Sequence, residues 1–148
     1  MKLLNIIRET GVAKPGMKVS EAFRICLADN VPGIPYVNAN GNIIGNFSIR
    51  ETLRRACIPE IVVEYADLIG DANDCLQVPE RHARRVLELD IEPFVMSCSA
   101  EIAPESAVAK AIALMERHRT NYLFVTSGKH YIGVVTIWNI ARRMLEIS

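Results

Sequence analysis

The sequence predicts an α+β fold in which one unit of the form β-α-β-β-α occurs twice, and three observations lead to this class. Apolar residues recur at helical spacing in some segments and in short extended runs in others. Two strand-to-helix junctions share one pattern: a Gly within an apolar strand, Ser or Thr three positions later, and a polar residue three positions after that. The two glycines, Gly45 and Gly133, lie 88 positions apart, which indicates an internal repeat.

The first copy has the pattern of a helix, a hairpin and a second helix. Pro32 and Gly33 end the first helix, and Asn40-Gly41 supplies the positive φ angles that a tight hairpin needs. Elements are expected as a short strand near 12–13, a helix over 19–27, strands over 34–37 and 42–47, and a helix from Ser48 that ends before Pro59. The residues expected on the apolar helix faces are Val19, Ala22, Phe23, Cys26 and Leu27, then Ile49, Leu53 and Ala56.

The second copy repeats each step, and Ser127-Gly128 takes the place of the hairpin turn. Its elements are expected as a short strand over 101–103, a helix from 108 to 115, strands over 122–126 and 131–135, and a helix over 137–145. The apolar faces of these two helices comprise Val108, Ala111, Ile112 and Met115, then Ile137, Ile140, Ala141, Met144 and Leu145.

Between the copies, helices are expected over residues 60–69 and 79–89, with a loop at 70–73 and an extended segment over 91–100. Residues 1–9 are expected to form a short amphipathic helix of the mature protein rather than a signal peptide, because polar residues interrupt them every few positions. The predicted organisation is a first repeat over 1–58, a helical connector over 59–93 and a second repeat over 94–148. No separate output domain is expected.

The composition predicts a packed, cytoplasmic protein. Half of the residues are hydrophobic and 17 basic residues balance 17 acidic ones, so no strong field favours nucleic acid or an anionic membrane. No apolar run reaches the roughly 18–20 residues of a membrane span. The sequence has four cysteines, which are Cys26, Cys57, Cys75 and Cys98. They form no C-x-x-C pair, which favours reduced thiols over disulfides. Cys26 and Cys57 are expected to be small buried hydrophobic residues.

Other chemistry has little support in the sequence. His82, His118 and His130 are far apart and lack metal-site spacing, and no phosphate loop or nucleophile elbow occurs, so neither a metal nor an enzyme is predicted. Nucleic-acid binding is the weakest hypothesis, since the neutral net charge opposes it. It rests on Arg54, Arg55, Arg81, Arg84, Arg85, Arg142 and Arg143.

The two copies together resemble tandem CBS (cystathionine β-synthase) domains, the paired unit also called a Bateman module. The resemblance covers nearly the whole chain and is carried by the Gly, Ser/Thr and Asp/Asn junction pattern after a hairpin. The second copy matches through Gly133, Thr136 and Asn139; the first matches through Gly45 and Ser48 but has Glu51 where the family has Asp or Asn.

The resemblance implies two repeats about a pseudo-twofold axis, with helices outside two small facing sheets and clefts between the repeats. It also implies a homodimer and a regulatory module that signals to a partner, whose identity the sequence does not give. The implied ligand is an adenosine-type molecule, namely AMP, ADP, ATP or S-adenosylmethionine, and no cofactor is required. The alternative is a non-catalytic dimerisation or interaction scaffold whose ligand sites have degenerated.

Each junction offers groups that suit such a ligand. The first turn of a helix can hold a phosphate, and a polar side chain at its third position can accept hydrogen bonds from a ribose. Arg50 lies in the first turn of the first junction and suits a phosphate, whereas Trp138 at the matching place can only stack or block. Tyr36, Val37, Phe124 and Val125 are candidates for the cleft walls, with hairpin core as the alternative favoured for the two valines.

The alternative at the first junction is a capping box, in which Ser48 accepts from the helix N–H groups and Glu51 reaches back to the N–H of Ser48. Capping is the favoured role for Glu51, so the junction at Asn139 is expected to be the better ligand site. Tight binding of a multiply charged nucleotide is in question, because Gly33 and Asn121 stand where related proteins often have a basic residue. Arg117, His118 and Arg119 are interpreted as solvated helix-end residues.

Overall fold

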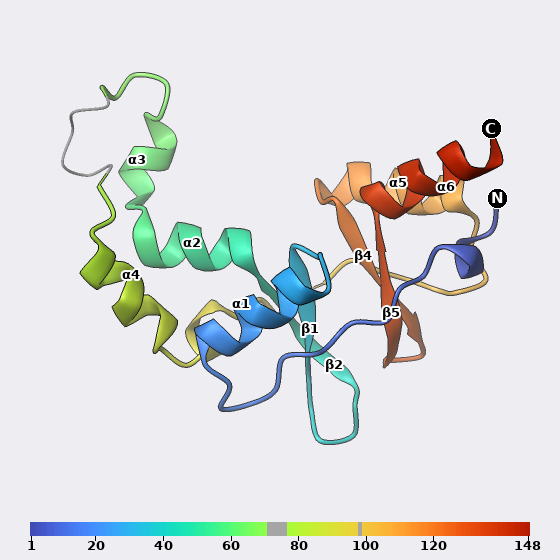
Figure 1. Ribbon diagram of the computed structural model, residues 1–148, viewed down its shortest axis with the longest axis horizontal. Coiled ribbons are helices and arrows are strands. Elements are labelled where there is room, and N and C mark those ends of the chain that lie inside the picture. Colours follow the sequence, from blue (N-terminus) through green and yellow to red (C-terminus); the bar gives the residue numbers. More distant parts are fainter. Residues whose placement is uncertain (71–76, 98) are drawn as a thin grey trace.

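The computed structural model describes residues 1–70, 77–97 and 99–148 and confirms an α+β fold with two small sheets (Figure 1). The first half contains α1 (Val19–Ala28), β1 (Gly33–Val37), β2 (Ile43–Ser48) and α2 (Ile49–Cys57). The second half contains β3 (Glu101–Ile102), α5 (Val108–His118), β4 (Tyr122–Ser127), β5 (His130–Thr136) and α6 (Ile137–Ile147). Between them lie α3 (Glu60–Glu64) and α4 (Glu80–Leu87), and short 3₁₀ turns cover Leu3–Asn5 and Glu92–Phe94.

The two sheets differ in their leading strand. In the second half, β4 pairs in parallel with β3 and antiparallel with β5. In the first half, β1 pairs antiparallel with β2, but the leading strand is reduced to one parallel bridge from Ala13 to Tyr36. Pro15 explains this, because the next hydrogen bond of a parallel ladder needs the N–H that proline lacks.

The segment that precedes each repeat crosses to the other repeat. Arg8 exchanges two backbone hydrogen bonds with Val134 of β5, at 3.0 and 2.8 Å, and Met96 exchanges two with Asn46 of β2, at 2.8 and 2.9 Å. The two pairs are equivalent in the repeat, because Arg8 and Met96 lie 88 positions apart and so do Asn46 and Val134. Figure 1 accordingly places the N-terminus beside the second half, near the C-terminus.

This exchange corrects the expectation of an N-terminal helix. Only Leu3–Asn5 forms a helical turn, of the 3₁₀ type, and the chain is extended around Arg8. The reason is tertiary: Leu3 and Ile6 are buried in the core of the second half, and the Arg8 backbone pairs with β5. An isolated amphipathic helix cannot make both contacts.

Close approach explains the glycines of the repeated junctions. A Cβ on Gly133 would lie 2.6 Å from the carbonyl oxygen of Arg8, and a Cβ on Gly45 would lie 2.8 Å from that of Met96. Real Cβ atoms do not approach so closely, so a glycine lets each crossing segment lie against its strand.

Two hydrophobic cores hold the halves together. The first contains α1, β1 and β2 residues with Val86, Ile91 and Phe94, and it also includes Phe124 and Val134 of the second half. The second surrounds Leu123, Val125 and Val135, as expected for hairpin core at Val125. The shared members of the first core show that the two hairpins pack against each other, and a bridge between Asn42 and His130 joins them directly.

The cysteines fit their predicted surroundings in part. Cys26 is fully buried, and this burial raises the pKa of its thiol to about 12, so it stays protonated. Cys57 is only half-buried and is a free thiol. Cys75 and Cys98 lie outside the described residues.

Several expected apolar face residues are exposed. Leu27 and Leu53 are 73% and 45% exposed, and Thr52 takes the buried place on α2, where its hydroxyl donates to the Ser48 carbonyl at 2.8 Å. On α6 only Asn139 and Ile140 are buried. Four further residues of the expected apolar faces of α5 and α6 are also exposed, namely Ile112, Ile137, Met144 and Leu145. One copy of the chain therefore covers only part of each apolar face.

The connector and hairpin turn differ from expectation in detail. The helix expected over 60–69 ends at Glu64, and the segment expected to be extended over 91–100 contains a 3₁₀ turn. Only Gly41 of the Asn40-Gly41 turn has positive φ, because the Asn38 side chain closes a wider loop by accepting from the N–H groups of Asn40 and Asn42. Residues 71–73 of the expected loop lie outside the described residues.

Candidate functional site

The two repeated junctions use the same cap. Ser48 is the N-cap of α2, and its Oγ accepts from the Glu51 N–H at 3.0 Å. Thr136 is the N-cap of α6, and its Oγ1 accepts from the Asn139 N–H at 3.1 Å. The Ser or Thr of the motif therefore satisfies one of the free N–H groups at each helix start.

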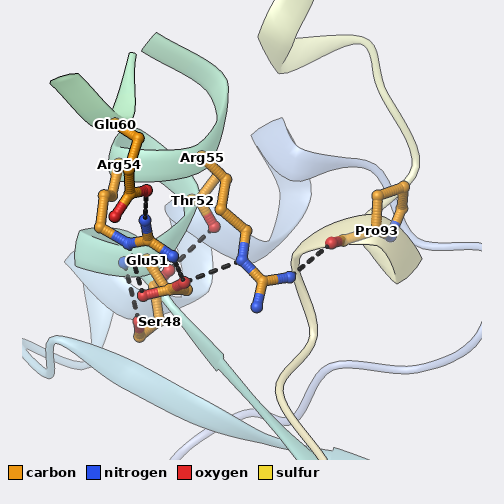
Figure 2. A network of polar contacts seen from close by, with 7 residues as sticks. All are labelled: Ser48, Glu51, Thr52, Arg54, Arg55, Glu60 and Pro93. Atoms are coloured by element: carbon orange, nitrogen blue, oxygen red, sulfur yellow. Dashed lines mark hydrogen bonds and ion pairs between the residues drawn. The ribbon is translucent and has the colours of Figure 1, made fainter. Parts of the chain in front are cut away.

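Glu51 does not complete the predicted capping box. Its carboxylate accepts from Arg54 Nη2 at 2.6 Å and Nε at 3.3 Å, and from Arg55 Nε at 2.8 Å (Figure 2). Two guanidinium groups on the next turn attract a carboxylate more strongly than one backbone N–H does. The network extends from Arg54 to Glu60 at 3.1 Å and from Arg55 to the Pro93 carbonyl at 2.9 Å.

This network shifts the acid–base behaviour of Glu51. The hydrogen bond from Arg54, with that from Arg55 and both positive charges, holds the pKa of the Glu51 carboxyl below its ordinary value. Its side chain is only 16% exposed, so the carboxylate stays ionised at neutral pH between two cations.

The lowered pKa predicts a pH-dependent contribution to stability. Because the folded pKa lies below the unfolded value, Glu51 stabilises the fold above about pH 4, the ordinary range of a Glu, and this contribution is lost as the pH falls through the folded value. Glu51→Gln should therefore reduce the difference in the free energy of unfolding between pH 7 and acid, as measured by urea denaturation. Glu116→Gln, at an exposed position of α5, should leave that difference intact. Equal pH profiles of both variants would contradict the role of the network.

A cavity of about 550 Å³ lies beside this junction and between the repeats. The first repeat contributes Ser48, Arg50 and Glu51 from the junction. The second contributes a run from His118 to Tyr122, together with Phe124, and Met96 and Ser99 lie at its crossing segment. The cavity is thus lined by the start of α2, by the Glu51 carboxylate, by basic side chains and by aromatic rings.

An aromatic wall closes one side of this cavity. The rings of Tyr122 and Phe124 lie 5.6 Å apart between centroids, and the Tyr122 hydroxyl donates to Asn46 Oδ1 at 3.2 Å. Burial raises the pKa of Tyr122, so its hydroxyl remains a neutral donor. Phe124 is 1% exposed, so it both lines the cavity and belongs to the shared core.

The junction at Asn139 has a much smaller cavity. Its volume is about 100 Å³, and it lies among Asn139, Arg142, Arg143 and the crossing segment that contains Arg8. Residues just after this segment fix its position. The Gly11 N–H donates to Asp29 at 2.7 Å, and the Thr10 hydroxyl is hydrogen-bonded to the Tyr131 hydroxyl.

The structure thus brings together half of the predicted site residues. Ser48, Arg50, Glu51 and Phe124 line the large cavity. Asn139 lines the small one. Thr136, Trp138 and Tyr36 line neither of these two cavities: Thr136 is buried, Trp138 is 43% exposed, and Tyr36 packs against the first core.

Sequence reasoning missed the basic side of the large cavity. His118 and Arg119 line it, as does Arg54, whereas the first two were interpreted as solvated helix-end residues. Arg119 ends α5 in a left-handed conformation, with φ at 51°. The available signal was the position of His118 and Arg119 at the end of α5, separated by only two residues from the strand that begins at Tyr122.

Over residues 1–70, 77–97 and 99–148, no group of three or more His, Cys, Asp or Glu side chains is arranged to hold a metal ion. Within the same ranges, no helix combines the length and apolar character needed to cross a membrane.

Comparison with known proteins relates the second half of the chain to a family and the whole chain to a fold. Residues 93–146 match the family model of the CBS domain, and no curated protein sequence matches the chain. Among solved structures, the CBS domain of a CBS domain containing membrane protein from Sphaerobacter thermophilus is similar, with a TM-score of 0.67 and 19% identity, over 96% of this chain and 86% of that one.

Two further structures are similar over almost their full length. CBSX2 in complex with AMP has a TM-score of 0.69 and 16% identity, covering 99% of this chain and 98% of that one. The CBS domain pair of protein MJ0100, in complex with 5′-methylthioadenosine and S-adenosyl-L-methionine, has a TM-score of 0.68 and 13% identity, covering 100% and 98%. At these identities the likeness shows the fold alone. Residues 93–146 thus match a CBS domain, and the chain as a whole has the fold of CBS domain pairs.

Proposed function

We propose that this CBS pair is a regulatory module that binds an adenosine-type nucleotide or S-adenosylmethionine in the cavity of about 550 Å³ at the Ser48–Glu51 junction. The cavity carries the proposal, because its volume falls within the roughly 300–1,000 Å³ of small-molecule sites and both repeats line it. The complexes of CBSX2 with AMP and of the MJ0100 pair with adenosine derivatives support this ligand class.

Three parts of the cavity suit the phosphate, the ribose and the base of the ligand. A phosphate lies at the start of α2, where Ser48 and Arg50 stand, and faces Arg119 across the cavity. The ribose hydroxyls donate to the Glu51 carboxylate. The base packs against Tyr122 and Met96.

The proposal reverses the order of sites expected from the sequence. A volume of about 100 Å³ beside Asn139 is too small for a nucleoside, whereas the first junction has space and cations. Gly33 and Asn121 stand where related proteins often have a basic residue for a phosphate. In the proposed site, His118 and Arg119 take that role, because both line the cavity.

Ligand binding regulates by a population shift. A ligand that touches α2 and the start of β4 joins the two repeats, so it favours one relative orientation and changes the surface presented to a partner protein. No catalytic step is part of this function, and we place the protein in the cytoplasm.

A homodimer covers the exposed apolar faces of α5 and α6. Ile112, Met144 and Leu145 are 50%, 57% and 77% exposed, which is typical of surfaces buried by association. Light scattering should give twice the mass of one chain, and a single-chain mass at high concentration would contradict the dimer.

Calorimetric titration with AMP, ATP and S-adenosylmethionine tests the ligand proposal. Saturable heat is expected for at least one ligand. Glu51→Ala should weaken binding, whereas Asn139→Ala should leave it unchanged. Loss of binding in Asn139→Ala with full binding in Glu51→Ala would assign the ligand to the other junction.

One observation favours the alternative function, an interaction scaffold without ligand. The carboxylate of Glu51 is already satisfied by Arg54 and Arg55, so a ribose must compete with two guanidinium groups. Absence of heat with all three ligands, in protein that scatters light as a dimer, would favour the scaffold. Salt-sensitive binding to random duplex DNA would instead support the nucleic-acid hypothesis.

A further inference from the structure

One arginine joins the large cavity to the connector between the repeats. Arg54 donates to the Glu51 carboxylate from Nε at 3.3 Å and from Nη2 at 2.6 Å, and it donates from Nη1 to Glu60 at 3.1 Å (Figure 2). Glu51 and Arg54 both line the cavity, and Glu60 is the first residue of α3. The guanidinium group therefore lies between a carboxylate of the cavity and a carboxylate of the connector.

A second arginine joins the same carboxylate to the other end of the connector. Arg55 donates from Nε to Glu51 at 2.8 Å and from Nη1 to the Pro93 carbonyl at 2.9 Å. Pro93 belongs to the 3₁₀ turn Glu92–Phe94, and Phe94 is buried in the first core. Among the described residues, Arg55 is not part of the cavity lining. The Arg55 contact is thus anchored at the core, whereas Arg54 faces the ligand.

The Glu51 carboxylate has space for only one more hydrogen bond. An ionised carboxylate offers about four lone-pair sites. Three are filled, because Oε1 accepts from Arg54 Nη2 and Arg55 Nε, and Oε2 accepts from Arg54 Nε. A ribose has two neighbouring hydroxyls, and each can donate. A ribose that donates both hydroxyls to Glu51 therefore displaces a guanidinium bond.

Arg54 is the arginine whose bonds give way. Its Nε bond to Glu51, at 3.3 Å, is the longest of the three. Its other partner, Glu60, has a side chain that is 82% exposed, and solvent weakens such an ion pair. Because Arg54 lines the cavity, its guanidinium group can turn from the two carboxylates to a ligand phosphate, which it can bind with two hydrogen bonds.

We infer that α3 reports whether the cavity is occupied, an inference that rests on the ligand site proposed above. The ribose hydroxyls replace Arg54 on Glu51, Arg54 turns to the phosphate, and its bond to Glu60 is lost. The start of α3 is then released from α2, while Arg55 keeps its bond to Pro93. Ligand binding thus changes the connector as well as the orientation of the repeats.

Hydrogen exchange with and without AMP tests this release. At saturating AMP, residues 60–69 should exchange about two- to fivefold faster, as expected for the loss of one exposed ion pair, whereas residues 118–124 of the cavity wall should exchange more slowly. Residues 19–28 of α1 are the control and should exchange no faster. Arg54→Gln should show the faster exchange at 60–69 without AMP and no further increase with it.

Calorimetric titration gives a reciprocal test, because coupling between two sites acts in both directions. Glu60→Gln frees Arg54 from α3 and should lower the dissociation constant for AMP about two- to fivefold. Glu64→Gln removes the same charge one turn later on α3 and should leave the constant unchanged. In an Arg54→Gln background, Glu60→Gln should have no effect, since the coupling passes through Arg54.

The outcomes separate this inference from the proposed function. Absence of AMP heat in the wild type contradicts the proposed function and the inference with it. Saturable heat with unchanged exchange at residues 60–69 overturns the inference alone. An equal gain in AMP affinity for Glu60→Gln and Glu64→Gln also overturns it, because a general charge effect would then replace the coupling through Arg54.

Discussion

Gly133→Ala is expected to lower the free energy of unfolding by about 2–4 kcal/mol, since overpacking costs about 1–3 kcal/mol and each backbone hydrogen bond lost adds about 1 kcal/mol. The added methyl group would lie 2.6 Å from the Arg8 carbonyl oxygen and 2.7 Å from Ile7 Cγ2. A backbone carbonyl cannot rotate away as a side chain does. The crossing segment must leave β5, and with it the paired hydrogen bonds between Arg8 and Val134.

Urea denaturation of the two proteins measures this loss. Gly70→Ala is the matched control, because no atom lies within 4 Å of its added Cβ, and its free energy should change by no more than about 0.5 kcal/mol. If Gly133→Ala were as stable as Gly70→Ala, the N-terminal segment would not pack on β5 as described.

Arg119→Gly is expected to separate stability from ligand binding. Arg119 has φ at 51°, a region that costs a side-chain-bearing residue roughly 1–2 kcal/mol and glycine almost nothing. The free energy of unfolding should therefore stay the same or rise by up to about 1 kcal/mol. The dissociation constant for AMP should rise about tenfold or more, because a charge-assisted hydrogen bond to the phosphate is lost.

Asn30→Gly is the matched control for this variant. Asn30 follows α1 with φ at 56°, in the corresponding left-handed position of the first repeat, and it does not line the large cavity. Its effect on AMP affinity, measured by the same calorimetric titration, should be negligible. Unchanged AMP affinity in Arg119→Gly would remove Arg119 from the site.

The local structure was largely predictable from the sequence. Helical spacing from Val19 onward and from Val108 onward, and the apolar strands around Gly45 and Gly133, placed α1, α5, β2 and β5 close to their observed bounds. Ser48 also caps its helix as the motif predicts. These features depend on residues close together in the chain, so periodicity and capping patterns report them directly.

The crossing segments were not predictable in this way. Residues 1–9 have a weak helical pattern, yet burial of Leu3 and Ile6 in the core of the second repeat decides their conformation. Leu145 lies on the predicted apolar face but is 77% exposed, because spacing shows which face is apolar and not what covers it. Tertiary contacts override local preference in both cases.

The candidate site shows the same division. The motif residues Ser48 and Glu51 were identified, but the partners of Glu51 were not, since the capping-box pattern does not weigh a backbone N–H against two guanidinium groups. The sizes of the two cavities depend on how the crossing segments pack, and no property of the junction motifs encodes that packing. The large cavity consequently lies at the junction that sequence reasoning ranked second.

The amide NMR spectrum of the labelled protein, recorded with and without AMP, tests the central claim most directly. The account predicts saturable shifts that concentrate in the segments 48–54 and 118–124, which contain most of the residues that line the cavity between the repeats. Shifts confined to residues 5–8 and 136–143 would place AMP at the Asn139 junction, and an unchanged spectrum would show that the cavity binds no AMP. Either result would contradict the account.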